Sequence, residues 1–110
     1  MIFHLAARDE WDDAESYRPD SLAEEGFIHC STAGQLVGVA NDLYAGRSDL
    51  LLLTIDPDAL DAPVVYEDCY ETGRLFPHLY GTLDSEAIVS VQPFPPGETG
   101  RFSWESLARR

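Results

Sequence analysis

The sequence predicts a single α+β domain with a small, partly antiparallel sheet and flanking helices. Its 110 residues match the commonest domain size, and hydrophobic residues make up 45% of them, enough for one buried core. Short strand-like and helix-like segments are mixed without the regular alternation of a doubly wound sheet. We expect a core over about residues 2–92, with residues 93–110 packing back on it through Phe102 and Trp104.

Apolar runs separated by polar breaks organise the first third of the chain. Residues 2–6 predict a strand, and the acidic residues that follow predict a helix through about residue 16. One or two helical turns are expected over residues 22–25, ended by Gly26. Apolar residues at helical spacing over 33–44 then predict the clearest helix of the chain.

Residues 26–32 form the junction at which we expect a site. They predict a strand that ends near His29, directly before a helix that Ser31 or Thr32 can cap. Side chains alternate along a strand, so His29 and Ser31 share one face while Cys30 points into the core. Because a helix start offers amide donors and a positive dipole end, His29 and Ser31 can bind one ligand together.

The second half of the chain is richer in predicted strands. Residues 50–55 are almost wholly apolar, which predicts a central strand covered on both faces. Residues 58–61 predict a turn, and the β-branched and aromatic residues 64–67 predict a strand that 69–72 can continue. Residues 87–91 alternate and predict the last strand, which the following prolines end.

Residues 76–81, with the sequence FPHLYG, predict a stiff loop. Its two aromatic side chains, Phe76 and Tyr80, flank His78, and such a loop can stack on a ligand ring and orient it. The alternative is a turn that only plugs the edge of the core.

The charge of the chain restricts its partners. Twenty acidic residues oppose seven arginines, with no lysine, for a formal net charge of −13. Such a chain repels nucleic-acid backbones and anionic membranes, so we expect neither as a partner. Two cysteines do not make a disulfide scaffold, and the N-terminus does not resemble a signal peptide. We therefore expect a cytoplasmic protein that binds a small molecule.

The histidines are the main candidates for chemistry. His4, His29 and His78 all lie beside expected strand ends or in the expected loop, and imidazoles exchange protons near neutral pH, so a common pocket is one interpretation. The other is that each ring only locks a turn. Glu67 ends a strand and either faces solvent or acts as an acid, base or cation stabiliser in a cleft. No motif has metal-ligand spacing, so we expect no metal.

Four stretches together resemble one known family. They are residues 26–31, 41–46, 65–67 and 76–81. On these motifs, in this order, the chain is identified as a member of the bacterial and plant family catalogued as domain of unknown function 952. Because that family is grouped with the ADP-ribosyltransferase-like superfamily, the resemblance implies a compact α+β fold with a split sheet and a cleft for a nicotinamide dinucleotide.

The resemblance also implies roles for particular residues. His4 would contact a ribose, Glu67 would stabilise an oxocarbenium-like centre, and Tyr44, Phe76 or Tyr80 would stack on nicotinamide. The cations near enough in sequence to meet a pyrophosphate would be Arg8, Arg18 and Arg74.

Three function hypotheses follow. The first is a pocket for a nucleotide-like ligand, with NAD as a substrate and transfer or hydrolysis at a glycosidic carbon. Its expected lining is His4, His29, Glu67, Phe76, His78 and Tyr80. The second is a non-enzymatic ligand-binding or partner-binding module on the same fold. The third is hydrolysis of an unrelated small molecule by an acid–base pair of His29 and Glu67. The oligomeric state stays open.

Overall fold

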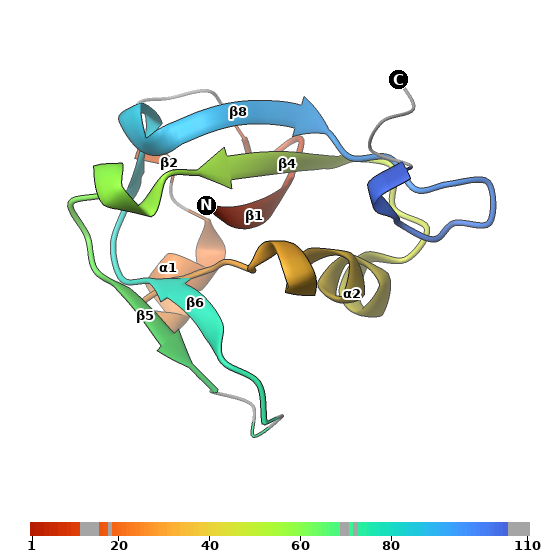
Figure 1. The fold of residues 1–110 in the computed structure, drawn as a ribbon. Helices are drawn as coiled ribbons and strands as arrows, with labels where there is room; N and C mark the ends of the chain where they lie inside the picture. The colour runs from red at the N-terminus through yellow and green to blue at the C-terminus, as the bar shows by residue number, and fades with distance from the viewer. Residues whose placement is uncertain (12–15, 18, 69–70, 72, 106–110) are drawn as a thin grey trace.

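The computed structural model describes residues 1–11, 16–17, 19–68, 71 and 73–105. Within these residues, the paired strands are all antiparallel (Figure 1). One sheet has the order β1–β4–β8 and contains β1 (Ile2–Ala7), β4 (Leu50–Ile55) and β8 (Ile88–Pro93). A second has the order β3–β6–β5 and contains β3 (Ile28–His29), β6 (Phe76–Leu79) and β5 (Val64–Glu67). The third pairs β2 (Ser16–Tyr17) with β7 (Leu83–Asp84).

In the described part of the chain, two α-helices and two short 3-10 helices connect these strands. They are α1 (Asp20–Glu25), α2 (Ala33–Tyr44), η1 (Pro57–Ala59) and η2 (Ser85–Ala87). Gly26 ends α1 in the left-handed region at φ 87°, where a residue without a Cβ is favoured. Thr32 precedes α2, and its amide donates to the Gln35 Oε1 at 3.1 Å, as in a capping box. Of the described residues, none belongs to a helix long and apolar enough to cross a membrane.

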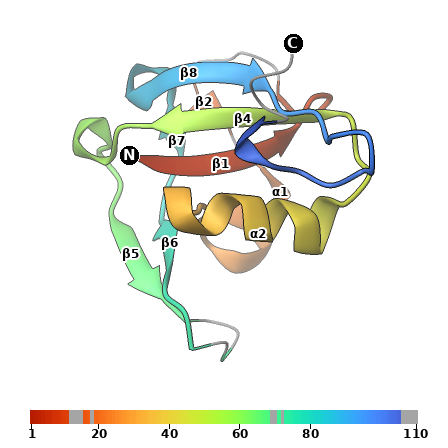
Figure 2. The same ribbon diagram turned by 45° about the vertical axis from the view of Figure 1, so that its right-hand side comes forward.

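A backbone bridge connects the two three-stranded sheets. The Phe3 amide donates to the Ser31 carbonyl at 2.8 Å, and the Ser31 amide donates to the Phe3 carbonyl at 2.7 Å. Figure 2 shows the consequence, with α2 running alongside β1 beneath the first sheet. The bridge thus places the end of β3 and the start of α2 beside β1.

Strand β4 is covered on both faces, as its apolar run predicts. Leu51, Leu53 and Ile55 belong to one buried cluster, which also includes residues of β1, β3 and β6. Leu50 and Leu52 belong to a second cluster with the buried face of α2. Alternation along the strand separates these two sets, because successive side chains point to opposite faces.

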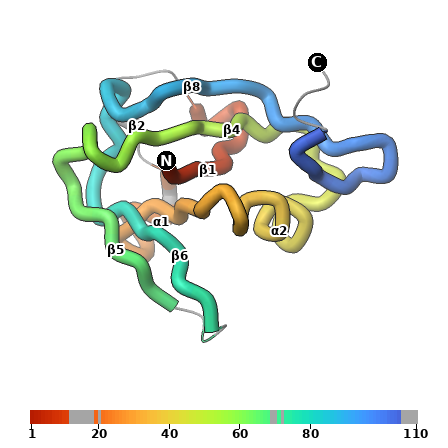
Figure 3. Tube along the Cα trace, viewed as in Figure 1, coloured from red at the N-terminus to blue at the C-terminus, as the bar shows by residue number. Residues whose placement is uncertain are grey.

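The C-terminal segment packs on the second of these clusters. Phe102 is 2% exposed and lies 5.0 Å from the Phe94 ring, whereas Trp104 is 45% exposed and meets the Phe3 ring edge-on at 6.0 Å. In Figure 3 this segment, in blue, lies beside the connection between α2 and β4, where the Gly46 amide donates to the Gly100 carbonyl at 2.9 Å. Phe102 is therefore part of the core, beside the last residues of the first sheet.

Most predicted elements are confirmed. Strands form at residues 2–7, 50–55 and 64–67, and α2 has the predicted bounds, with Gly46 at φ 82° just beyond its end. The last strand begins at Ile88, one residue later than predicted. The predicted continuation over 69–72 lies mostly outside the described residues.

The predicted loop at 76–81 is wrong, because Phe76–Leu79 is the central strand of the second sheet. Proline normally interrupts a strand because it lacks an amide donor. Here the Pro77 carbonyl still accepts from the Cys30 amide at 3.1 Å, so the ladder toward β3 survives.

The predicted helix through residue 16 is also wrong. Residues 8–10 form a turn in which the Glu10 amide donates to the Ala7 carbonyl at 3.0 Å, and Ser16 belongs to β2. Residues 12–15 lie outside the described part. Asp9 and Glu10 therefore lie in an exposed turn, a position that suits acidic residues as well as the first turn of a helix does.

Candidate functional site

A cavity of about 620 Å³ lies between β1, β3, β6 and α2. All three histidines line it, and each comes from a different strand: His4 from β1, His29 from β3 and His78 from β6. His29 and His78 are direct partners in the β3–β6 ladder, and their ring centroids are 5.6 Å apart. Sheet pairing therefore brings together side chains that are far apart in the sequence.

His4 is held by the backbone of the neighbouring strand. Its Nδ1 lies 2.6 Å from the His29 carbonyl oxygen, which can only accept, so Nδ1 carries the proton. Burial lowers the pKa of His4 from 6.5 to about 4, against the smaller opposing effect of that hydrogen bond. At neutral pH the ring is thus uncharged, and any group that meets its Nε2 must be a donor.

Glu67 pairs with His78 from the side of β5. Its Oε1 lies 3.0 Å from His78 Nδ1 and also accepts a hydrogen bond from the Tyr80 hydroxyl. These two hydrogen bonds, first that of Tyr80 and then that of His78, hold the pKa of Glu67 below its usual value. The carboxylate is therefore ionised at neutral pH and accepts from both partners.

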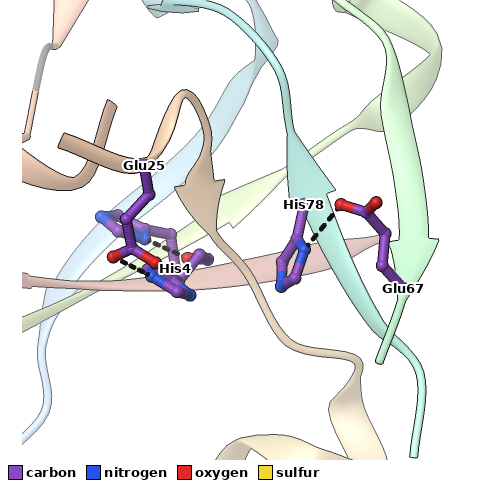
Figure 4. A network of polar contacts seen from close by, with 5 residues as sticks. His4, Glu25, Glu67 and His78 are labelled. Atoms are coloured by element: carbon purple, nitrogen blue, oxygen red, sulfur yellow. Dashed lines mark hydrogen bonds and ion pairs between the residues drawn. The ribbon is translucent and has the colours of Figure 1, made fainter. Parts of the chain in front are cut away.

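A second glutamate pairs with the second histidine of the ladder. His29 Nε2 lies 3.0 Å from the Glu25 Oε1, at the end of α1. Figure 4 shows that the Glu25 contact and the Glu67–His78 contact come from different sides of the site. The side chains of the Glu25–His29 pair are exposed, whereas His78 is only 1% exposed and lines the cavity.

The Phe27 ring packs against both histidines of the β3–β6 ladder, His29 and His78. Its ring stacks on His78 at 4.1 Å between centroids and 17° between planes, and it meets His29 edge-on at 4.9 Å. The ring also lies 5.3 Å from that of Tyr80. Sequence reasoning missed this role, because a buried phenylalanine beside a strand is indistinguishable from an ordinary core residue.

The other candidate residues divide into two groups. Ser31, Tyr44 and Phe76 line the cavity with the histidines. Glu67 and Tyr80 are not among the described residues that line the cavity. Instead, the Glu67 carboxylate contacts His78 and accepts a hydrogen bond from Tyr80. The expected pocket lining is thus found for four of its six residues, and Glu67 reaches the cavity only through His78.

Two arginines lie at the cavity, one of which sequence reasoning did not name. Arg74, one of the three cations named from the sequence, lines it, and Arg47 lines it from the segment that follows α2. Arg47 makes two hydrogen bonds to Asp49, at 2.9 and 2.6 Å, and its guanidinium lies 5.6 Å from the Tyr44 ring centroid. Arg8 is not part of the described lining, and Arg18 lies outside the described residues.

Acidic side chains and a buried thiol also line the cavity. Glu10 and Asp42 also line the cavity. Cys30 lines it too, and burial raises the pKa of its thiol to about 12, so the thiol stays protonated. In the described part of the chain, no cluster of three histidine, cysteine or carboxylate side chains has the geometry to hold a metal ion.

Comparison with known proteins identifies relatives of the same size. The crystal structure of protein CC0527 from Caulobacter crescentus is 27% identical, covers 97% of each chain and has a TM-score of 0.81. The solution NMR structure of the same protein is 25% identical over 93% of this chain and 90% of that one, with a TM-score of 0.79. No curated protein matches. Residues 2–91, which include every candidate site residue, match a family model, and the chain therefore belongs to the family described as "Protein of unknown function (DUF952)".

Proposed function

We propose that the cavity binds a nucleotide-like small ligand and that the protein transfers or hydrolyses this ligand at its glycosidic carbon, with NAD as a substrate. One observation carries the proposal: three histidines from three strands line a single cavity of about 620 Å³. That volume lies within the range of small-molecule sites. Imidazoles that converge in such a space can bind hydroxyls and exchange protons.

The cavity offers contacts for each part of a dinucleotide. Tyr44 and Phe76 present aromatic rings on which a pyridine or a base can stack. His4, neutral and protonated on Nδ1, can accept a hydrogen bond from a ribose hydroxyl through Nε2. Arg74 and Arg47 can meet a phosphate. This distribution agrees with the ADP-ribosyltransferase-like placement that the motifs suggest.

The first test is binding of NAD, followed by thermal unfolding. A ligand at a hundred times its dissociation constant adds about 2.7 kcal/mol to the free energy of unfolding, so we expect a clear rise in Tm with millimolar NAD. Nicotinamide release, measured by chromatography, then reports the glycosidic step. Absence of any Tm shift at millimolar NAD contradicts the proposal.

Two tyrosines supply a matched pair of variants for this test. Tyr44 lines the cavity, whereas Tyr66 is exposed on β5 and is not among the described lining residues. We expect Tyr44→Ala to weaken NAD binding and Tyr66→Ala to leave it unchanged. Equal binding by both variants would remove Tyr44 from the ligand site.

The second candidate is a binding module without catalysis, and the charge of the cavity favours it. Glu10 and Asp42 line the cavity, and Asp49 already neutralises Arg47, which weakens attraction for a pyrophosphate. Absence of both a rise in Tm with NAD and nicotinamide release during prolonged incubation would support this candidate over the enzyme.

A further inference from the structure

We propose that Glu67 is a positioning residue that holds His78 in its Nδ1–H form, so that His78 Nε2 accepts a proton from the water that attacks the ligand. The chemical step rests on the function proposed above, whereas the arrangement of the two side chains can be tested without any ligand. Glu67 thereby acts through His78 rather than on the sugar directly.

The hydrogen bonds of Glu67 determine which nitrogen of His78 carries the proton. An ionised carboxylate can only accept, so the 3.0 Å contact between its Oε1 and His78 Nδ1 requires a proton on Nδ1. The Tyr80 hydroxyl donates to the same oxygen and keeps it in place. In the neutral ring, Nε2 is then a lone-pair acceptor, and any group that meets it must donate.

Packing fixes the orientation of the His78 ring as well as its tautomer. Phe27 stacks on one face at 4.1 Å, and the β3–β6 ladder sets the backbone of His78 opposite His29. Only 1% of His78 is exposed, and the ring borders the cavity. A ring held by stacking, pairing and a carboxylate meets the requirement that a catalytic base be preorganised.

The proposed step is hydrolysis of the bond between the ribose and the nicotinamide of NAD. Water gives one proton to His78 Nε2 while its oxygen bonds to the glycosidic carbon of NAD. The bond from that carbon to the pyridine nitrogen breaks, and its electron pair stays on the nitrogen, so nicotinamide leaves uncharged. The imidazolium is stabilised by the Glu67 carboxylate and then releases its proton to solvent. No protonation of the leaving group is needed, because the pyridinium is already cationic.

The tautomer is read directly by long-range ¹H–¹⁵N spectra of the ¹⁵N-labelled full chain without ligand. We expect His78 to carry its proton on Nδ1 in the wild type and to lose this preference in Glu67→Ala. Glu67→Gln, which keeps an acceptor of the same size, should show the preference in weakened form. A wild-type His78 protonated on Nε2 alone, or a tautomer that Glu67→Ala leaves unchanged, overturns the proposal.

Two variants on α1 control for indirect effects. Glu24→Ala removes an exposed neighbouring carboxylate and should leave the His78 signals unchanged. Glu25→Ala removes the partner of His29 and should move the signals of His29 more than those of His78. Loss of the His78 preference in all of these variants alike would contradict a specific role for Glu67.

The kinetic readout uses NAD as the probe. Where the wild type releases nicotinamide, we expect Glu67→Ala to lower kcat by about 100-fold with little change in KM, the range typical of acid–base catalysis. A raised KM with unchanged kcat overturns the proposal, since Glu67 would then serve binding. Absence of nicotinamide release by the wild type contradicts the proposed hydrolysis, and the tautomer experiment still decides the arrangement of Glu67 and His78.

Discussion

Burial decides the protonation state of individual groups in this cavity. His4 is 6% exposed and has its pKa lowered to about 4, and the Cys30 thiol has its pKa raised to about 12. Both groups therefore stay uncharged at neutral pH, because a charged form would lose its hydration. Burial thus keeps these two groups of the cavity available as uncharged hydrogen-bonding partners.

The lowered pKa of His4 predicts acid sensitivity. Between pH 6.5 and about 4 the unfolded chain binds a proton at this position and the folded chain does not, so the free energy of unfolding falls as pH falls through this window. The expected loss is about 3 kcal/mol. His4→Asn keeps a donor for the His29 carbonyl but does not titrate.

Urea unfolding of the wild type and His4→Asn from pH 4 to 8 measures this effect as a difference. The many carboxylates of the chain contribute equally to both curves and cancel. We expect a constant difference above pH 7 and a growing disadvantage of the wild type below pH 6.5. Parallel curves over the whole range would show that His4 titrates alike in the folded and unfolded chains.

Directly after β6, the strand that carries His78, residues 80–81 lie very close to the backbone of residues 62–63. The strand β6 ends at Leu79, and directly after it the Tyr80 amide donates to the Pro63 carbonyl at 2.9 Å. A Cβ built at Gly81 would lie 2.5 Å from the Cβ of Ala62, which is closer than real carbon contacts. Glycine is thus required at position 81 by space, not by backbone conformation.

We therefore predict that Gly81→Ala destabilises the protein by about 1–3 kcal/mol, the usual cost of overpacking. Ala62→Gly removes the opposing methyl group, so the double variant should recover part of the loss. Gly38→Ala is the control: it lies in α2 with open space around it and should stabilise by about 0.5–1 kcal/mol. Additive effects of Gly81→Ala and Ala62→Gly in chemical denaturation would disprove the clash.

Across the whole molecule, hydrogen bonds attach the C-terminal segment to α2. The Asn41 side chain donates to the Phe102 carbonyl at 3.0 Å and accepts from the Phe102 amide at 2.7 Å. Phe102 then fills the cluster that also covers one face of β4. Because α2 also contributes Tyr44 to the cavity, anchoring of the tail and shape of the site are linked through one helix.

Asn41→Ala should lower the free energy of unfolding by about 1–3 kcal/mol, because two backbone groups of Phe102 lose their partner. Asp42→Ala, at an exposed neighbouring position, should change it by less than about 0.5 kcal/mol. Thermal and urea unfolding of both variants measure the effect. Equal stability of the two variants would mean that water replaces the Asn41 contacts without cost.

Local pattern explains which elements were predictable from the sequence. The apolar run of β4 and the helical spacing of α2 depend on periodicity along the chain, and both elements have their predicted bounds. At β6 the sequence predicts a loop instead, because proline is by itself a turn former. Its place in a sheet depends on pairing with β3 and β5, which no local pattern contains.

By itself, the sequence determined the α+β class, the central strand, the main helix and the types of residue that could form a site. Only the tertiary structure decided that His4, His29 and His78 line one cavity and that the Glu67 carboxylate contacts His78. The physical reason is that propensity and periodicity act within a few residues of each other. Convergence depends instead on strand register and on the bridge between Phe3 and Ser31, which join distant parts of the chain.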